Sequence, residues 1–175
     1  FLMSKIVYLN SKFVKFRDAK IHIEDRGLQF SDSVYEVVSV FNGKLIDYAF
    51  HIKRLKFSLK ELNIKYKVET KKLNNIFKKL ILKNNINTGI IYLQITRGIQ
   101  PRNHAYSDKY IPNVIIYARK KSFNLPGKSF VGKTAITLKD LRWKRRDIKT
   151  VSLLPNILAK KKSRTKRMLR SYFNW

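Results

Sequence analysis

Two adjacent residues, Asn42 and Gly43, most limit the folds that are open to this chain. They separate two strand-like apolar runs at residues 37–41 and 44–48. A two-residue turn between strands requires positive φ at both central positions, which asparagine and glycine adopt more readily than other residues. The pair therefore predicts a tight β-hairpin, and a hairpin requires an antiparallel sheet.

Further apolar runs predict the remainder of this sheet. Additional strands are expected at residues 6–9, 13–16, 90–96 and 114–118. Over residues 50–62, and again over 73–81, apolar side chains recur at steps of three and four, the spacing of a helix with one buried face. The long polar stretch 97–112 predicts a loop. Two helices covering an antiparallel sheet of five or six strands make a small two-layer α+β domain.

The character of the chain changes after this domain. Residues 121–128 contain asparagine, proline and glycine in close succession, which predicts a linker. We therefore expect an N-terminal α+β domain over residues 1–120. A strand at 134–138 and a helix beginning near 155–156 follow. We interpret residues 129–175 as the truncated start of a second domain.

The net charge of +28, from 39 lysines and arginines against 11 acids, is the most unusual feature of the composition. A field of this strength attracts nucleic acid and anionic membranes, so a basic binding module acting through residues 160–170 is one interpretation. The lysines are, however, interleaved through every segment. We therefore expect neither a specific nucleic-acid site nor a membrane site.

Other residue types exclude several classes of protein. The chain has no cysteine, and its three histidines lack the spacing of metal ligands, so no disulfide scaffold and no metal site is expected. It has no apolar stretch long enough to span a membrane, and its first residues do not resemble a signal peptide. These features predict a cytoplasmic protein.

Lys149 differs from most lysines of the chain in its surroundings. It follows Asp147 by two residues and stands at the head of the apolar run 148–154, and four cations precede it: Arg142, Lys144, Arg145 and Arg146. A lysine that attacks an aldehyde must first lose its proton. Positive neighbours and partial burial favour this, because both disfavour the protonated amine. In a chain this basic a solvent-facing lysine is the commoner outcome, so from the residues alone both interpretations stay open.

The segment around Lys149 resembles a known family. Residues 147–156 read D-I-K-T-x-x-L-L-P-N, which is similar to the segment that carries the cofactor lysine in fold-type IV aminotransferases, enzymes that use pyridoxal 5'-phosphate (PLP). The Arg-Trp pair at 142–143 resembles the D-amino-acid aminotransferases in particular. The resemblance implies that PLP is the cofactor and that Lys149 is its Schiff-base lysine.

Two further motifs belong to the same resemblance. Residues 25–36 match the block D-R-G-x-x-F-x-D-x-V-Y-E, which implies that Tyr35 lies on the substrate side of the cofactor. Residues 51–55 match H-x-x-R-L, which implies that Arg54 contacts the cofactor phosphate. Spacing alone would instead favour a strand tyrosine at the edge of the core and a solvated helix arginine.

The R-x-H at residues 102–104 carries the implied substrate class. It resembles the carboxylate-binding pair of D-amino-acid aminotransferases, in which the two residues reach into the neighbouring subunit. Arg102 and His104 are therefore expected to hold the substrate α-carboxylate with Tyr35, in a homodimer. The implied reaction is transamination between a D-amino acid, of the D-alanine type, and a 2-oxo acid. Branched-chain aminotransferases and aminodeoxychorismate lyases, which share the fold, are the alternatives.

The resemblance continues to about residue 162. Residues 163–175 are basic and contain no acid and no apolar period. One choice of codons for them, read one nucleotide later, encodes Ala-Glu-Gln-Lys-Glu-Cys-Tyr-Glu-Ala-Ile-Leu-Ile, which resembles a family continuation. We therefore predict that this tail is a frameshift product that packs poorly against residues 129–159. The chain as given would then be an inactive fragment without the groups that bind the pyridine nitrogen and part of the phosphate.

Overall fold

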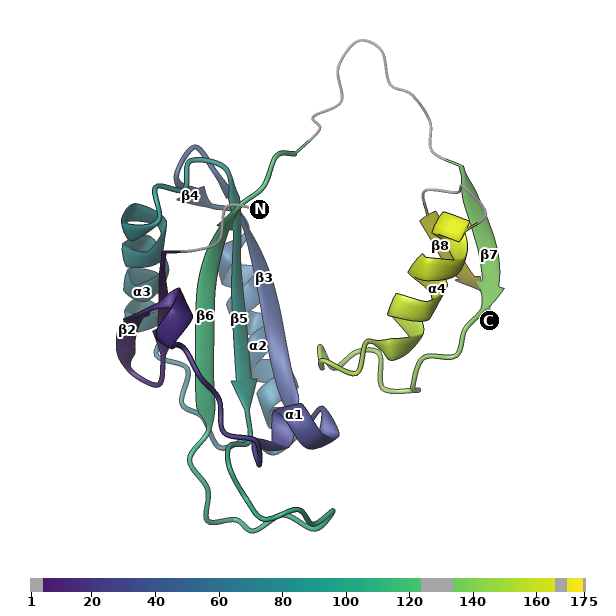
Figure 1. Cartoon of the computed structure of the whole chain (residues 1–175), viewed down its shortest axis with the longest axis horizontal. Helices are drawn as coiled ribbons and strands as arrows, with labels where there is room; N and C mark the ends of the chain where they lie inside the picture. Colours follow the sequence, from purple (N-terminus) through teal and green to yellow (C-terminus); the bar gives the residue numbers. More distant parts are fainter. Residues whose placement is uncertain (1–4, 124–133, 166–169, 175) are drawn as a thin grey trace. The chain divides into compact units, whose positions relative to one another are not determined.

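The computed structural model describes residues 5–123, 134–165 and 170–174 (Figure 1). The chain divides into two compact units, which are described separately below. The first unit contains Phe1–Phe123 together with Ile148–Val151, and the second contains Asn124–Asp147 and Ser152–Trp175. The short segment that carries Lys149 thus groups with the first unit. The predicted boundaries stay a prediction, because most of the expected linker lies outside the described residues.

The first unit is built on a six-stranded sheet. Its strands are β1 (Ile6–Leu9), β2 (Lys12–Lys15), β3 (Ser33–Phe41), β4 (Lys44–Leu45), β5 (Gly89–Thr96) and β6 (Asn113–Lys120). Their order is β2-β1-β6-β5-β3-β4, and every neighbouring pair is antiparallel. The predicted α+β class with an antiparallel sheet is confirmed.

The predicted hairpin turn has the expected backbone. Asn42 and Gly43 have φ of 49° and 70°, so both central residues adopt the left-handed conformation that the turn requires. The second strand of this hairpin is shorter than predicted, because β4 ends at Leu45 rather than near residue 48. The chain turns at Asp47, whose φ is 52°, and begins a helix at Tyr48.

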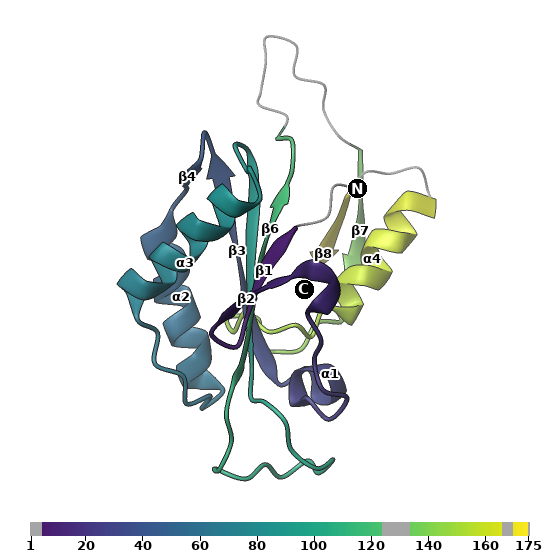
Figure 2. The same cartoon turned by 60° about the vertical axis from the view of Figure 1, so that its left-hand side comes forward.

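Two helices cover one face of the sheet, as Figure 2 shows: α2 (Tyr48–Glu61) and α3 (Thr70–Lys83). Side chains of the long strands alternate between this face and the other one. Val34, Glu36 and Val38 of β3 are buried, whereas Tyr35 and Val37 are half-buried. The core combines the buried strand face with the helix stripes and includes Leu55, Phe77, Leu80, Ile91, Leu93, Ile95 and Ile116.

Two short helices were not predicted: the 3-10 helix η1 (Phe16–Asp18) and α1 (Arg26–Phe30). The N-cap of α1, Asp25, is 1% exposed and accepts hydrogen bonds from the backbone of Gly27 and Leu28. Its other carboxylate oxygen accepts from Thr96 Oγ1 at 2.7 Å and from Asn113 Nδ2 at 2.6 Å. One buried carboxylate thus attaches α1 to the ends of β5 and β6.

The second unit contains β7 (Ala135–Lys139), α4 (Leu154–Thr165) and β8 (Arg170–Asn174), and β7 and β8 pair in parallel. The basic tail was predicted to pack poorly against residues 129–159, but its described residues Arg170–Asn174 pair with Ala135–Lys139 at all five positions. Helix α4 runs to Thr165, since lysine and arginine are good helix formers. Strand pairing uses main-chain groups, so side-chain charge does not prevent β8. The frameshift itself stays a prediction. Within the described ranges, no helix is long and apolar enough to cross a membrane.

Candidate active site

The main chain at Lys149 is fixed between β3 and α2. Its carbonyl accepts from the Tyr35 amide at 2.9 Å, and its amide donates to Ser58 Oγ at 3.1 Å. Thr150 forms a bridge with Val34 on the edge of β3 that β5 does not occupy. Ile148 is 4% exposed and belongs to the core. The segment Ile148–Val151 is therefore attached to the edge of β3 through one bridge and neighbouring hydrogen bonds.

The side chain of Lys149 is half-buried and lies against an aromatic ring. Its Nζ is 4.2 Å from the ring centroid of Tyr35. Tyr35 stacks on Tyr92 at 5.8 Å, and Tyr92 stacks on Tyr117 at 5.0 Å. Burial, with smaller contributions from Tyr117 and Tyr35, raises the pKa of Tyr92 to about 12. A row of tyrosines therefore leads away from the amine on the sheet face opposite the helices.

Arg54 lies one helical turn before Ser58 on α2. Its Nε and Nη2 donate to the two carboxylate oxygens of Glu36, each at 2.7 Å. Glu36, only 1% exposed, also contacts His51 Nδ1 at 2.8 Å. The hydrogen bonds that Arg54 donates to Glu36 raise the pKa of its guanidinium above the ordinary value. A buried carboxylate thus sets the orientation of a cation whose side chain is 46% exposed.

Arg102 and His104 lie on the loop between β5 and β6, which projects past the end of the sheet beside α1 (Figure 1). Both side chains are exposed. The Arg102 guanidinium is 4.7 Å from the ring centroid of Phe30, and the His104 ring is 5.4 Å from it. The five predicted residues therefore form two groups. Lys149, Tyr35 and Arg54 lie on or beside β3 and α2, and Arg102 and His104 lie on the loop between β5 and β6.

The three arginines that precede Lys149 in the sequence have carboxylate partners. In the second unit, Arg142 and Arg146 contact Asp140 at 2.9 and 2.6 Å, and Arg145 contacts Asp147 at 2.9 Å. Hydrogen bonds from Arg142 hold the pKa of Asp140 well below its ordinary range. Part of the positive charge expected around Lys149 is therefore compensated within that unit.

Comparison with known proteins supports the motif assignment. Residues 33–168 match the family model described as amino-transferase class IV. This range contains every predicted site residue. The chain belongs to the class IV aminotransferase family.

Curated relatives carry a more specific name. The chain is 45% identical over 159 residues to a D-alanine aminotransferase of Listeria monocytogenes, a match that covers 90% of this chain and 55% of that protein. It is 39% identical over 155 residues to a D-alanine aminotransferase of Staphylococcus epidermidis, covering 88% and 55%. The chain thus spans about half the length of the curated relatives it matches.

Solved structures confirm the class IV fold. The branched-chain amino acid aminotransferase of Escherichia coli superposes with a TM-score of 0.82 at 21% identity, over 96% of this chain and 57% of that one. A putative 4-amino-4-deoxychorismate lyase of Legionella pneumophila gives 0.78 at 20% identity, over 91% and 58%. At these identities the likeness concerns the fold alone. The predicted resemblance to fold-type IV aminotransferases is confirmed.

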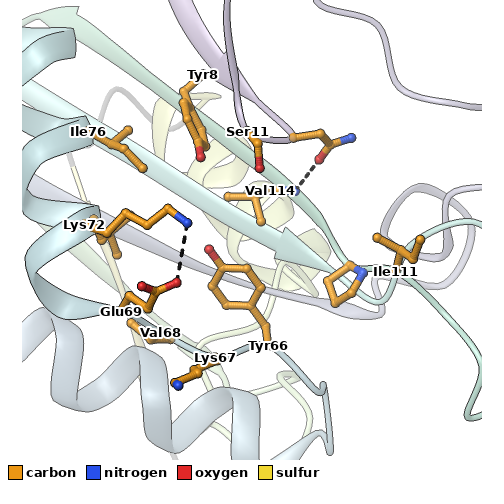
Figure 3. Close-up of a pocket in the computed structure, with 13 residues that line it drawn as sticks. Tyr8, Ser11, Tyr66, Lys67, Val68, Glu69, Lys72, Ile76, Ile111 and Val114 are labelled. Carbon is orange, nitrogen blue, oxygen red and sulfur yellow. Dashed lines mark hydrogen bonds and ion pairs between the residues drawn. The ribbon is translucent and has the colours of Figure 1, made fainter.

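A separate cleft of about 350 Å³ lies in the first unit, between α3, β1 and the segment that precedes α3 (Figure 3). Tyr8, Tyr66 and Lys72 point toward its interior (Figure 3). None of the five predicted residues lines it. This cleft is therefore separate from the residues predicted to bind PLP and the substrate.

Sequence reasoning gave no role to three residues that contact the candidate site residues or their loop: Ser58, Glu36 and Arg26. A small polar residue on the buried stripe of a helix, such as Ser58, gives no distinctive signal. Glu36 does give a signal in the sequence. Alternation along β3 turns its side chain toward the core, where a buried carboxylate needs a partner. Arg26 lies inside a matched block, but its contacts are with a loop more than 70 residues away.

Proposed function

We propose that this chain contributes to PLP-dependent transamination between a D-amino acid and a 2-oxo acid, with Lys149 as the cofactor lysine. One observation carries the proposal. Three residues identified by separate motifs are connected through neighbouring contacts: Lys149 Nζ lies over the ring of Tyr35, the Lys149 amide donates to Ser58 one turn after Arg54, and Arg54 holds Glu36 beside Tyr35. Solvated lysines and arginines on unrelated surfaces would not converge in this way.

The chemistry of these side chains suits PLP, which carries an aldehyde and a phosphate. A half-buried primary amine suits the aldehyde, and an arginine suits the phosphate. Arg54 uses Nε and Nη2 to hold Glu36, so the edge that contains Nη1 points elsewhere. Since the side chain is half-exposed, an anion can reach this edge.

When bound, PLP supplies an electron sink that makes the α-hydrogen of an amino acid acidic. Lys149 Nζ is then the group on this chain that moves the proton from the substrate α-carbon. Its main chain is fixed on both sides, by Ser58 and by Tyr35, so Nζ approaches the α-carbon from one face. Selection of one enantiomer requires such a fixed approach.

Arg102 and His104 are proposed to bind the substrate α-carboxylate. Arginine binds a carboxylate through two parallel hydrogen bonds, and histidine can add a third donor. Because the loop projects past its own sheet, we propose that it completes the site of a second copy of the chain in a homodimer. The D-alanine aminotransferase relatives support D-amino acids as the substrate class.

The test is to express the protein from its complete gene, load it with PLP, reduce it with borohydride and map the modified peptide. We expect the adduct on Lys149. Lys149→Ala should remove the adduct and lower transamination by about four orders of magnitude or more, as loss of a covalent catalytic group does. Lys144→Ala, five residues away in the same basic stretch, is the matched control and should keep the adduct. An adduct on another lysine would contradict the assignment.

The same preparation distinguishes the substrate classes. D-Alanine should be used in preference to L-leucine and to aminodeoxychorismate. A preference for L-leucine would favour branched-chain aminotransfer, and release of pyruvate from aminodeoxychorismate would favour the lyase. Either result would leave the role of Lys149 intact and overturn the carboxylate role given to Arg102 and His104.

A further inference from the structure

Arg26 is a buried cation whose bonds converge on the loop that carries Arg102 and His104. It is 4% exposed. Its Nη1 donates to the carbonyl of Asn103 at 2.6 Å, and its Nη2 donates to the carbonyl of His104 at 3.2 Å. One guanidinium therefore holds the main chain at the two consecutive residues that follow Arg102.

Arg26 is itself held by a shared carboxylate. Its Nε donates to Asp32 Oδ2 at 2.9 Å, and the same oxygen accepts from Arg97 Nε at 2.7 Å. Arg97, 3% exposed, stands at the start of the loop and also donates to the carbonyls of Leu62 and Asn63 at 2.7 and 3.0 Å. Asp32 thus joins the base of the loop, the end of α2 and the cation that holds the loop tip.

Aromatic rings extend this network to the exposed side chains. The ring of Phe30 lies 4.7 Å from the Arg26 guanidinium and 4.7 Å from that of Arg102, and it contacts the ring of His104. Tyr106, on the far side of the loop, lies 3.7 Å from the Arg97 guanidinium. A shift of Arg26 would therefore move both the main chain and the ring that Arg102 and His104 contact.

The interior of the loop is braced separately. Gln100, 7% exposed, accepts from the Ser107 amide at 2.9 Å and donates to the Ser107 carbonyl at 3.2 Å. This side-chain brace closes the loop across residues 100–107. Main-chain bonds from Gln100 to Glu24 and from Arg26 to Gly98 tie the base of the loop to the start of α1. The side chain of Arg26 adds a connection at the tip.

We propose that Arg26 is a positioning residue for carboxylate recognition: by holding the carbonyls of Asn103 and His104, it sets where Arg102 and His104 meet the substrate carboxylate. This inference rests on the proposed function. The two buried arginines share one carboxylate, so the network keeps a net positive charge behind the loop tip. That charge favours the approach of an anion.

The test compares two probes that react with a bound pyridoxal aldehyde. Aminooxyacetate carries a carboxylate, and hydroxylamine has the same reactive group without one. In PLP-loaded protein from the complete gene, Arg26→Gln should weaken aminooxyacetate binding by about 10- to 100-fold, the loss expected for charged hydrogen bonds. Reaction with hydroxylamine should not change. Arg26→Lys keeps the charge but loses the several donors of the guanidinium, so it should weaken aminooxyacetate binding less than Arg26→Gln does.

Arg17→Gln is the matched control, because it removes the same charge from a side chain that is 78% exposed. It should leave the reactions with both probes unchanged.

A second measurement needs no cofactor: amide hydrogen exchange should accelerate over residues 100–107 in Arg26→Gln, and not over β3. Equal losses for the two probes would overturn the proposal in favour of a general structural role, and so would an unchanged response to aminooxyacetate. If the wild-type protein reacts with neither probe, the proposed function itself fails.

Discussion

The segment of Lys149 and the loop of Arg102 and His104 are both fixed in place, but by different kinds of contact. Neutral groups hold Lys149: main-chain amides and carbonyls, the hydroxyl of Ser58 and the buried side chain of Ile148. The loop is held by two buried arginines and one aspartate. Each kind of anchor matches what the proposed site needs.

A carboxylate beside a nucleophilic lysine would favour the protonated form of its amine, so a neutral anchor fixes the lysine without that penalty. A loop that binds an anion benefits instead from positive charge behind it. The type of anchor, and not only its strength, is therefore matched to the chemistry of the residue it positions. Three substitutions test this difference.

The largest effect is expected from Ile148→Ala, which removes the buried side chain that holds the segment of Lys149 in the core. Removing a buried isoleucine side chain leaves a cavity and should lower the free energy of unfolding by about 2–4 kcal/mol. Urea denaturation measures the loss. Ile23→Ala is the control, because Ile23 is 76% exposed and its loss should stay within about 0.5 kcal/mol. Equal losses would show that Ile148 does not anchor the segment.

Gly98→Ala should have an intermediate effect, on the loop side. Gly98 has φ of +98°, and a Cβ atom there would collide with the carbonyl oxygen of Ile111. Strain of this kind costs about 1–3 kcal/mol. Gly43→Ala, at φ +70° with open space around it, should cost less. Hydrogen exchange should accelerate in the loop and not in Ile148–Val151; faster exchange in both would contradict the separation of the two anchors.

The smallest effect concerns Tyr92, next to Tyr35 in the tyrosine row. Burial raises its pKa to about 12, from about 10 in an unfolded chain. The protonated phenol therefore contributes stability that is complete below about pH 10 and is lost as pH rises toward 12. Tyr92→Phe removes this dependence, so urea midpoints of the wild type should fall more steeply than those of the variant between about pH 10 and pH 12. Parallel curves would contradict the burial of the hydroxyl.

Most of the sheet and both long helices could be predicted, because their signals are local. Alternation marks β3, and apolar spacing marks α3. Helix α1 could not be predicted, since five residues are too few for a periodic pattern and its N-cap, Asp25, is held by Thr96 and Asn113. The same limit applies to β8, which exists through its pairing with β7.

The candidate site divides in the same way. Motifs identified Lys149, Tyr35 and Arg54, because each stands in a recognisable run of residues. The contacts that join them were not predictable, since Ser58 and Lys149 are 91 positions apart and no local pattern links them. The role proposed for Arg26 likewise becomes visible only when its carbonyl partners are known.

The bridge between Val34 and Thr150 also has a consequence for the order of assembly during synthesis. Every strand of the first unit is outside the ribosome once β6 has left the exit tunnel, but Ile148–Val151 follows only after the 24 residues Asn124–Asp147. At about 5–20 residues per second, a ribosome needs roughly 1–5 s for that interval. Throughout it the nascent sheet carries an open edge beside Val34, the kind of edge that recruits foreign strands. Arrival of Ile148–Val151 covers the edge at Val34, so the step that brings Lys149 to the candidate site also covers this part of the nascent sheet.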